Sequence, residues 1–137
     1  MIIPDIGTMK LSRLFKSGED LEDKSIGDIS DSNALKRIAV NEPDYRLRIE
    51  AVRRIYDNNF LYDIVKNDSN RSVKIAAVDN ITNESYLESI AKSHTDCHVR
   101  MAAIKRIEDA SVLDYIAQND SNKSVRKIAL KKIKRIM

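Results

Sequence analysis

The chain has 137 residues, of which 42% are hydrophobic and 33% are charged, and its formal net charge is +3. This balance is ordinary for a soluble protein and excludes a long disordered chain. No run approaches about 20 apolar residues, so neither a membrane span nor a membrane partner is predicted. Cys97 is the only cysteine, which excludes a scaffold built on intrachain disulfides. The first residues do not resemble a signal peptide, so the expected location is cytoplasmic.

The first 34 residues are predicted to form a tail and a divergent first repeat. Residues 1–8 contain Pro4 and Gly7 without periodicity, and we interpret them as a loose N-terminal tail. Apolar residues at 11, 14 and 15 then share one face of a helix. Residues 1–34 carry seven acidic and four basic side chains, a net charge of −3. Residues 9–34 are therefore predicted to form a polar terminal repeat that caps the array, because the terminal repeat faces water on one side.

From Leu35 onward one pattern recurs with a 26-residue period, and it is clearest between Leu113 and Ile133. A fixed period of this size indicates an array in which each repeat stacks on its neighbours. We therefore predict one repeat domain over residues 9–137, divided into 9–34, 35–60, 61–86, 87–112 and 113–137. Equivalent positions hold one leucine and one alanine per repeat: Leu35, Leu61, Leu87 and Leu113, and Ala51, Ala77, Ala103 and Ala129.

Each repeat predicts two short helices, and three Gly and two Pro in the chain leave few helix breakers. The first segment places apolar residues at i, i+3 and i+4, the single stripe of an outer helix. The second segment is apolar over a wider arc, which predicts an inner helix that packs on more than one side. The predicted fold class is therefore all-α.

Polar residues mark the expected helix starts. Asp or Asn lies four residues before each leading leucine, where its side chain can accept hydrogen bonds from the free N–H groups of the first helix. These predicted caps are Asp31, Asp57, Asn83 and Asp109. For the second helices, Ser72 and Ser124 directly precede Val73 and Val125, and they are predicted as caps.

The order Asp, Val, Arg or Lys, Ala and an aliphatic residue resembles the core of HEAT repeats, in the short form of phycobilin-lyase-like and other prokaryotic HEAT proteins. It is carried by Asp68, Val73, Lys74, Ala77 and Ile81, and by Asp120, Val125, Arg126, Ala129 and Ile133. The resemblance implies a right-handed α-solenoid of about five two-helix repeats whose second helices line a concave side. A leucine-rich repeat variant is less similar, because its turn prolines are mostly missing here.

The same resemblance implies a ladder of acidic and basic side chains between successive turns. An intramolecular ladder is favoured over a binding row because a six-residue offset from acid to base recurs along the array. The repeat at residues 87–112 departs from the pattern with His94 at the acidic position and Asp96 as the substitute. The expected ladder comprises Glu42, Arg48, Asp68, Lys74, Asp96, Arg100, Asp120 and Arg126.

A second basic row lies on the outward side of the second helices, within residues 35–137, which carry 20 basic and 14 acidic side chains, a net charge of +6. Asp79 interrupts this row. Two interpretations stay open: a solvated face, or a strip that contacts an acidic protein segment or phosphates. The candidate partner-binding residues are Arg53, Arg54, Lys105, Arg106, Lys131, Lys132, Lys134 and Arg135.

His94, Cys97 and His98 form a His-x-x-Cys-His motif with Asp96 inside it. Structural zinc sites normally need four ligands, and no second cluster exists in the sequence. No metal or other cofactor is therefore expected. Adjacent residues such as Cys97 and His98 rarely orient each other for nucleophilic catalysis, and phosphate loops and serine elbows are missing. The chain is predicted not to be an enzyme.

The leading hypothesis is a non-catalytic protein–protein interaction or scaffold module that holds an acidic partner along the second helices. The alternative is nucleic-acid or phosphate binding through the same basic strip, which is disfavoured because no aromatic residues interleave with the cations. An accessory subunit of a lyase or modifying enzyme follows from the resemblance alone. Apolar residues at the end of the chain, Leu130, Ile133, Ile136 and Met137, predict a possible homodimer through the last repeat.

Overall fold

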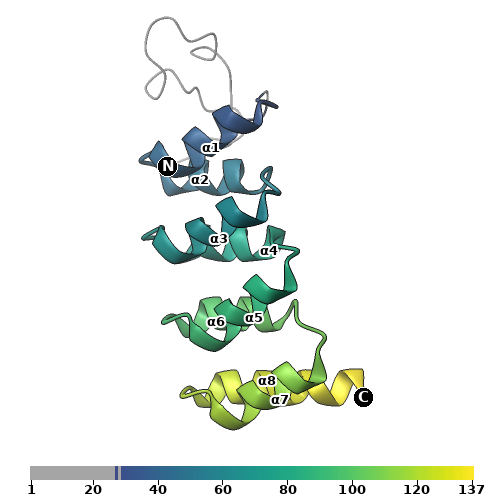
Figure 1. Ribbon diagram of the computed structural model, residues 1–137. Coiled ribbons are helices and arrows are strands. Elements are labelled where there is room, and N and C mark those ends of the chain that lie inside the picture. The colour runs from purple at the N-terminus through teal and green to yellow at the C-terminus, as the bar shows by residue number, and fades with distance from the viewer. Residues whose placement is uncertain (1–26, 28) are drawn as a thin grey trace, which may run out of the picture. The chain divides into compact units, whose positions relative to one another are not determined.

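The computed structural model describes residue 27 and residues 29–137, and within this part of the chain it contains eight α-helices and no strand (Figure 1). The prediction of an all-α fold is confirmed for these residues. The predicted tail at residues 1–8 and most of the predicted cap at residues 9–34 lie outside them. None of the described helices combines the length and the apolar character that crossing a membrane requires.

The chain divides into two compact units, Met1–Tyr56 and Asp57–Met137. In the first unit, α1 (Ser32–Asn41) packs against α2 (Tyr45–Val52). Their contact buries Leu35 and Ile38 of α1 and Leu47 of α2.

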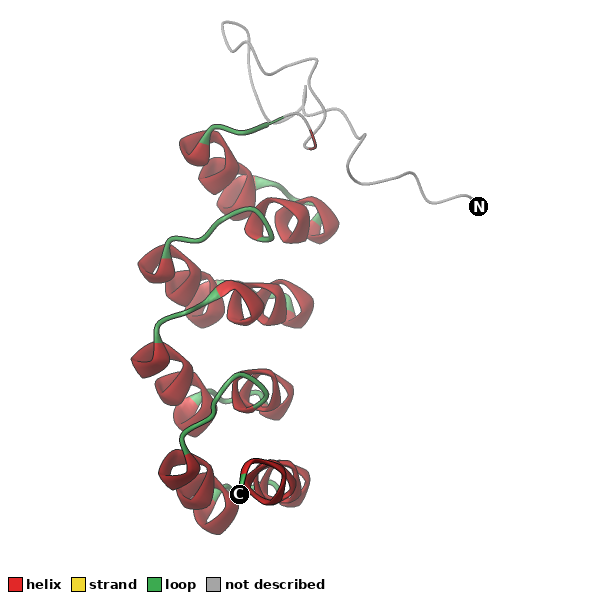
Figure 2. Cartoon of the chain, turned by 90° about the vertical axis from the view of Figure 1, so that its right-hand side faces the viewer, coloured by secondary structure: helices red, strands yellow, loops and turns green. Residues whose placement is uncertain are grey.

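The second unit contains three helix pairs. They are α3 (Asn58–Asn67) with α4 (Arg71–Asn80), α5 (Glu84–Ser93) with α6 (Cys97–Ile104), and α7 (Ala110–Asn119) with α8 (Lys123–Ile136). Within this unit α4 packs on α6 and α6 on α8, so the even-numbered helices form one layer and the odd-numbered helices the other (Figure 2).

Burial in the second unit follows the apolar pattern of each helix. The outer helix α3 buries one stripe, and the inner helix α4 buries residues over a wider arc that includes Val73, Ala76 and Val78. Alanines at the equivalent position of α4, α6 and α8, Ala77, Ala103 and Ala129, are fully buried. A methyl side chain at this place lets neighbouring helices approach to interaxial distances of about 8–10 Å.

Helix starts recur at half the period of the repeat, and each one is an Asp or Asn whose side chain accepts hydrogen bonds from the first turn. The four caps predicted for the first helices are confirmed. The caps of the second helices are Asp44, Asn70, Asp96 and Asn122.

The prediction of Ser72 and Ser124 as caps is wrong. Both serines already lie inside a helix, and their backbone N–H groups donate to the side-chain oxygens of Asn70 and Asn122 at 2.8 Å. A capping side chain must precede the first turn to reach its N–H groups, and the asparagine two residues earlier occupies that place.

Candidate functional site

At Arg100, the predicted ladder consists of two different kinds of contact. Arg100 binds the carboxylate of Asp120 in a bidentate pair, with Nε–Oδ2 at 2.9 Å and Nη2–Oδ1 at 3.0 Å. Only 9% and 5% of these side chains are exposed. The remaining nitrogen, Nη1, donates to the backbone carbonyls of His94 at 2.7 Å and Thr95 at 3.2 Å. Arg100 therefore joins the turn of its own repeat to the acid of the next repeat.

The sequence predicts a pair between an acid and the base six residues later. In the structure, two of these bases donate to the backbone carbonyl of the acidic residue and not to its carboxylate. Arg126 donates to the carbonyl of Asp120 at 2.7 Å, and Arg48 donates to the carbonyl of Glu42 at 2.9 Å. The carboxylate partner of Arg100 lies 20 residues further along the chain. Arg48 and Arg126 lie near the start of the inner helices α2 and α8, and each contacts the preceding turn of its own repeat through a backbone carbonyl.

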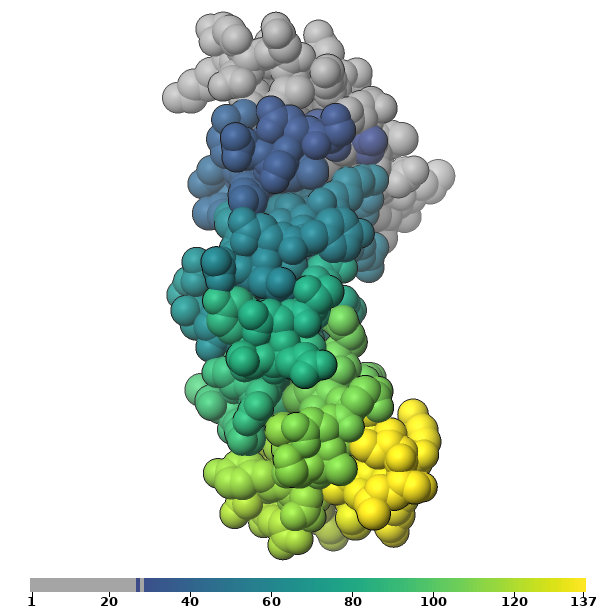
Figure 3. All heavy atoms as spheres, turned by 45° about the vertical axis from the view of Figure 1, so that its right-hand side comes forward, coloured from purple at the N-terminus to yellow at the C-terminus, as the bar shows by residue number. Residues whose placement is uncertain are grey.

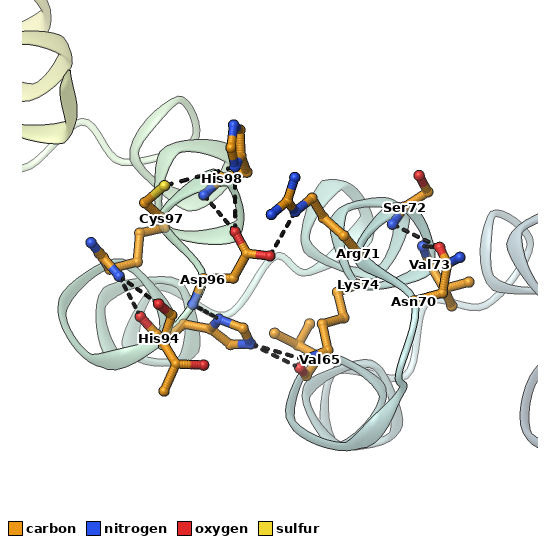
Figure 4. A network of polar contacts seen from close by, with 12 residues as sticks. Val65, Asn70, Arg71, Ser72, Val73, Lys74, His94, Asp96, Cys97 and His98 are labelled. Carbon is orange, nitrogen blue, oxygen red and sulfur yellow. Dashed lines mark hydrogen bonds and ion pairs between the residues drawn. The ribbon is translucent and has the colours of Figure 1, made fainter. Parts of the chain in front are cut away.

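Asp96 does not take the acidic position of the ladder in the repeat at residues 87–112. It caps α6, where Oδ1 accepts from the His98 N–H at 2.8 Å and Oδ2 accepts from Arg71 Nε at 2.6 Å (Figure 4). Burial raises the pKa of Asp96, but the hydrogen bonds from Arg71 and His98 and their positive charge outweigh it and lower the pKa to about 2. His94 occupies the ladder position instead, and its Nδ1 accepts from the Asp96 N–H at 3.0 Å.

Three possible metal ligands lie together at the start of α6. Ligand atoms of Asp96, Cys97 and His98 are within 4.8 Å of one another. His94 is outside this set because its Nδ1 faces the Asp96 N–H and its Nε2 faces the Val65 carbonyl at 3.2 Å. The guanidinium of Arg71 and the positive end of the helix oppose a cation here. The geometry therefore gives no support to a metal site.

Four of the eight candidate partner-binding residues line one hollow of about 310 Å³ in the second unit. They are Lys105, Lys131, Lys132 and Arg135, and Ile128 is the fifth lining residue. Lys105 follows α6 and the other three lie on α8, which forms part of the molecular surface (Figure 3, yellow). Helix α8 contains seven basic residues and no acidic residue. The hollow is accordingly a concentrated positive surface.

In the second unit, two cations of the row have structural contacts. Lys132 is 8% exposed, and its Nζ donates to the carbonyls of Ile104 at 3.1 Å and Lys105 at 2.6 Å. One repeat earlier, Arg106 donates in the same way to the carbonyls of Val78 at 2.9 Å and Asp79 at 2.7 Å. Each cation donates to two carbonyls at the end of the preceding inner helix, where the last carbonyls have no partner within the helix. The carbonyls of Val78 and Ile104 also accept from the N–H groups of Ile81 and Ile107. The sequence interpretation missed this role, although the equivalent places of Arg106 and Lys132 in consecutive repeats were a signal for it.

The other cations of the hollow are available to a ligand. Lys105, Lys131 and Arg135 are exposed, and none of them has a side-chain hydrogen bond or ion pair within the described residues. Lys134 is also exposed but does not line the hollow. Within the second unit, the candidate row therefore offers free positive charge at three side chains around the hollow and at one beside it.

Arg53 and Arg54 are in a different situation. They belong to the first unit, where both pair with Glu50, at 3.9 Å and 2.9 Å. Their charge is partly neutralised, so the predicted row is not uniform along the chain.

Comparison with protein-family models, with curated proteins and with solved structures gives no match for this chain. The assignment of candidate residues accordingly depends on geometry and charge alone.

Proposed function

We propose that the chain is a non-catalytic interaction module whose α6–α8 surface binds an acidic segment of a partner protein in the cytoplasm. The observation that carries this proposal is the hollow of about 310 Å³ lined by Lys105, Lys131, Lys132 and Arg135, without an acidic lining residue. Lys132 pairs with Glu108 at 3.4 Å, so the unpaired charge of the hollow comes from Lys105, Lys131 and Arg135. Unpaired charge in a concave surface raises the local concentration of an oppositely charged partner.

The surroundings of the hollow favour a peptide over a nucleic acid. Ile128 is the one apolar lining residue, which suits a single aliphatic side chain flanked by carboxylates. Asp79 on α4 is exposed and ends the positive surface after two repeats. A nucleic acid would require a longer row of phosphate contacts, and single-strand binding would also require aromatic platforms.

The tyrosines of the second unit cannot provide such platforms at the hollow. Tyr62 on α3 and Tyr86 on α5 stack on each other, with ring centroids 4.4 Å apart, and Lys66 covers Tyr62 at 4.6 Å. Tyr115 on α7 is covered by Lys92 at 4.7 Å. These rings lie on the outer helices and already have partners.

The proposal includes a right-handed α-solenoid of about five short HEAT-like repeats as the scaffold. Its support is the regular spacing of the helix starts and the bidentate pair between Arg100 and Asp120 of consecutive repeats.

The non-catalytic assignment is supported by the start of α6, where Cys97 Sγ at 3.7 Å and Asp96 Oδ1 at 3.5 Å both approach Nδ1 of His98. A catalytic triad needs its nucleophile and its orienting acid on opposite ring nitrogens.

Two double charge reversals on α8 test the proposal. Lys131→Glu/Arg135→Glu changes the hollow, and Lys123→Glu/Lys127→Glu makes the same change on exposed residues outside it. The probe is a fluorescent peptide of Asp and Glu around one Leu, and its binding is followed by anisotropy. We expect the first variant to weaken binding about tenfold or more and the second to change it about threefold or less. Equal losses in both variants would refute a site in the hollow.

A mixed-sequence DNA duplex is the second probe in the same assay. Nucleic-acid binding loses affinity steeply with salt, because counterions are released from each neutralised phosphate. Tighter binding of the duplex than of the acidic peptide at 150 mM salt would replace the proposed function with the rival one.

A further inference from the structure

In the second unit, a basic side chain of one repeat contacts the residue 20 positions later, which belongs to the next repeat. We call each such contact a rung of the ladder. For Arg100 this residue is Asp120, and the pair is bidentate and almost completely buried. For Lys74 it is His94, with Lys74 Nζ 3.5 Å from His94 Nε2 (Figure 4). This contact is the only side-chain interaction of Lys74 within the described residues. The rung between α4 and α6 therefore lacks the carboxylate of the following rung.

His94 reproduces the structural role of the missing acid but not its charge. Its Nδ1 accepts from the Asp96 N–H at 3.0 Å, as Oδ1 of Asp120 accepts from the Asn122 N–H at 2.8 Å. A ring whose Nδ1 accepts carries its proton on Nε2, which here faces the carbonyl of Val65 at 3.2 Å. The turn is satisfied by an uncharged acceptor, and the ammonium of Lys74 has no anion beside it.

A cavity of about 280 Å³ lies beside this rung, between α3 and α5, and no acidic residue lines it. Lys66, Lys74, Ser93 and Thr95 contribute polar lining groups. The hydroxyls of Ser93 and Thr95 have no hydrogen-bond partner among the described residues, whereas Lys66 pairs with Asp63 at 3.4 Å. One ammonium and two hydroxyls are thus available as donors into one cavity.

We propose that this cavity binds a phosphoryl group, held by Lys74, Ser93 and Thr95. A phosphoryl group presents three strong acceptor oxygens, which match one charged and two neutral donors. The anion supplies beside Lys74 the negative charge that Asp120 supplies beside Arg100. The site combines Lys74 of α4 with the end of α5 and the turn that follows it, and it shares no residue with the hollow at α8, so it is independent of the proposed function.

The chain offers its own control for this proposal. Lys74→Arg/His94→Asp replaces the contact between Lys74 and His94 with a copy of the Arg100–Asp120 pair. A carboxylate at position 94 can still accept from the Asp96 N–H. The rebuilt protein is expected to fold, which circular dichroism checks, and to lose the site. A second variant, Ser93→Ala/Thr95→Val, changes only exposed side chains and removes two donors.

The test is an NMR titration of ¹⁵N-labelled protein with sodium phosphate, against sodium chloride at equal ionic strength. We expect saturable shifts of the amides at residues 93–95 with phosphate and not with chloride. Affinity should fall at least tenfold in the rebuilt variant and about three- to tenfold in the hydroxyl variant. Lys131→Glu/Arg135→Glu should leave these shifts unchanged, which separates this site from the hollow at α8.

Glycerol phosphate and a phosphoserine peptide distinguish the possible sources of the group. Tighter binding of the first than of inorganic phosphate indicates a small phosphate ester, and tighter binding of the second indicates a phosphorylated side chain. Shifts that do not saturate, that chloride reproduces, or that persist in the rebuilt variant would overturn the proposal.

Discussion

Removing the carboxylate of Asp120 is the perturbation whose cost the structure fixes most closely. In Asp120→Ala the guanidinium of Arg100 loses two hydrogen bonds, at 2.9 Å and 3.0 Å, while it stays in a place where only 9% of its side chain is exposed. An unpaired buried charge of this kind costs about 3–5 kcal/mol. The same change removes the acceptor of the Asn122 N–H at 2.8 Å. We expect the free energy of unfolding to fall by about 3–5 kcal/mol.

Urea denaturation followed by circular dichroism measures this cost. The control is Glu88→Ala, which breaks a pair of similar length, Lys92 Nζ to Glu88 at 2.7 Å, with side chains 31% and 42% exposed. Such an exposed pair is worth at most about 0.5 kcal/mol. A double-mutant cycle with Arg100→Met should give a coupling of about 1–3 kcal/mol. A cost below about 1 kcal/mol for Asp120→Ala, or no coupling, would refute the account of the rung.

Three further predictions concern packing, charge and helix ends. Ala103→Leu overpacks a fully buried position and should lower stability by about 1–3 kcal/mol in urea denaturation; unchanged stability would contradict the close helix packing. Because folding lowers the pKa of Asp96 to about 2, the unfolded chain binds more protons as the pH falls from about 4 to 2, and stability drops across this window. Asp96→Asn keeps a capping side chain but loses the pair with Arg71, so the drop between pH 5 and 2.5 should shrink by about 1 kcal/mol; an unchanged drop would contradict it. Lys132→Ala should cost about 1–2 kcal/mol and its neighbour change Lys131→Ala about 0.5 kcal/mol or less, and equal costs would show that Lys132 does not support the end of α6.

Much of the fold could be predicted because the repeat gives the same information several times. The leading leucines and the buried alanines recur at one spacing, and the caps of the first helices follow from them. The caps of the second helices were mispredicted because serine directly precedes the valine in only two of the four repeats, at Ser72 and Ser124. An Asp or Asn at every half period marks both kinds of helix start.

The candidate site was harder to predict because adjacent basic residues have different surroundings. Lys131 and Lys132 are equivalent by composition, but successive residues of a helix point about 100° apart, and only Lys132 reaches the carbonyls of α6. The ladder poses a similar problem, because a base six residues after an acid contacts its carbonyl, and only the stacking of repeats shows the carboxylate partner. The homodimer through the last repeat stays a prediction.

Chemical-shift mapping of the acidic peptide on the ¹⁵N-labelled chain shows which surface binds it. We expect the largest amide shifts at Lys105 and between Ile128 and Arg135, and we expect them to disappear in Lys131→Glu/Arg135→Glu. Lys123→Glu/Lys127→Glu should retain them. Shifts spread evenly over the basic residues, or centred on other helices, would contradict a partner site at the α6–α8 hollow.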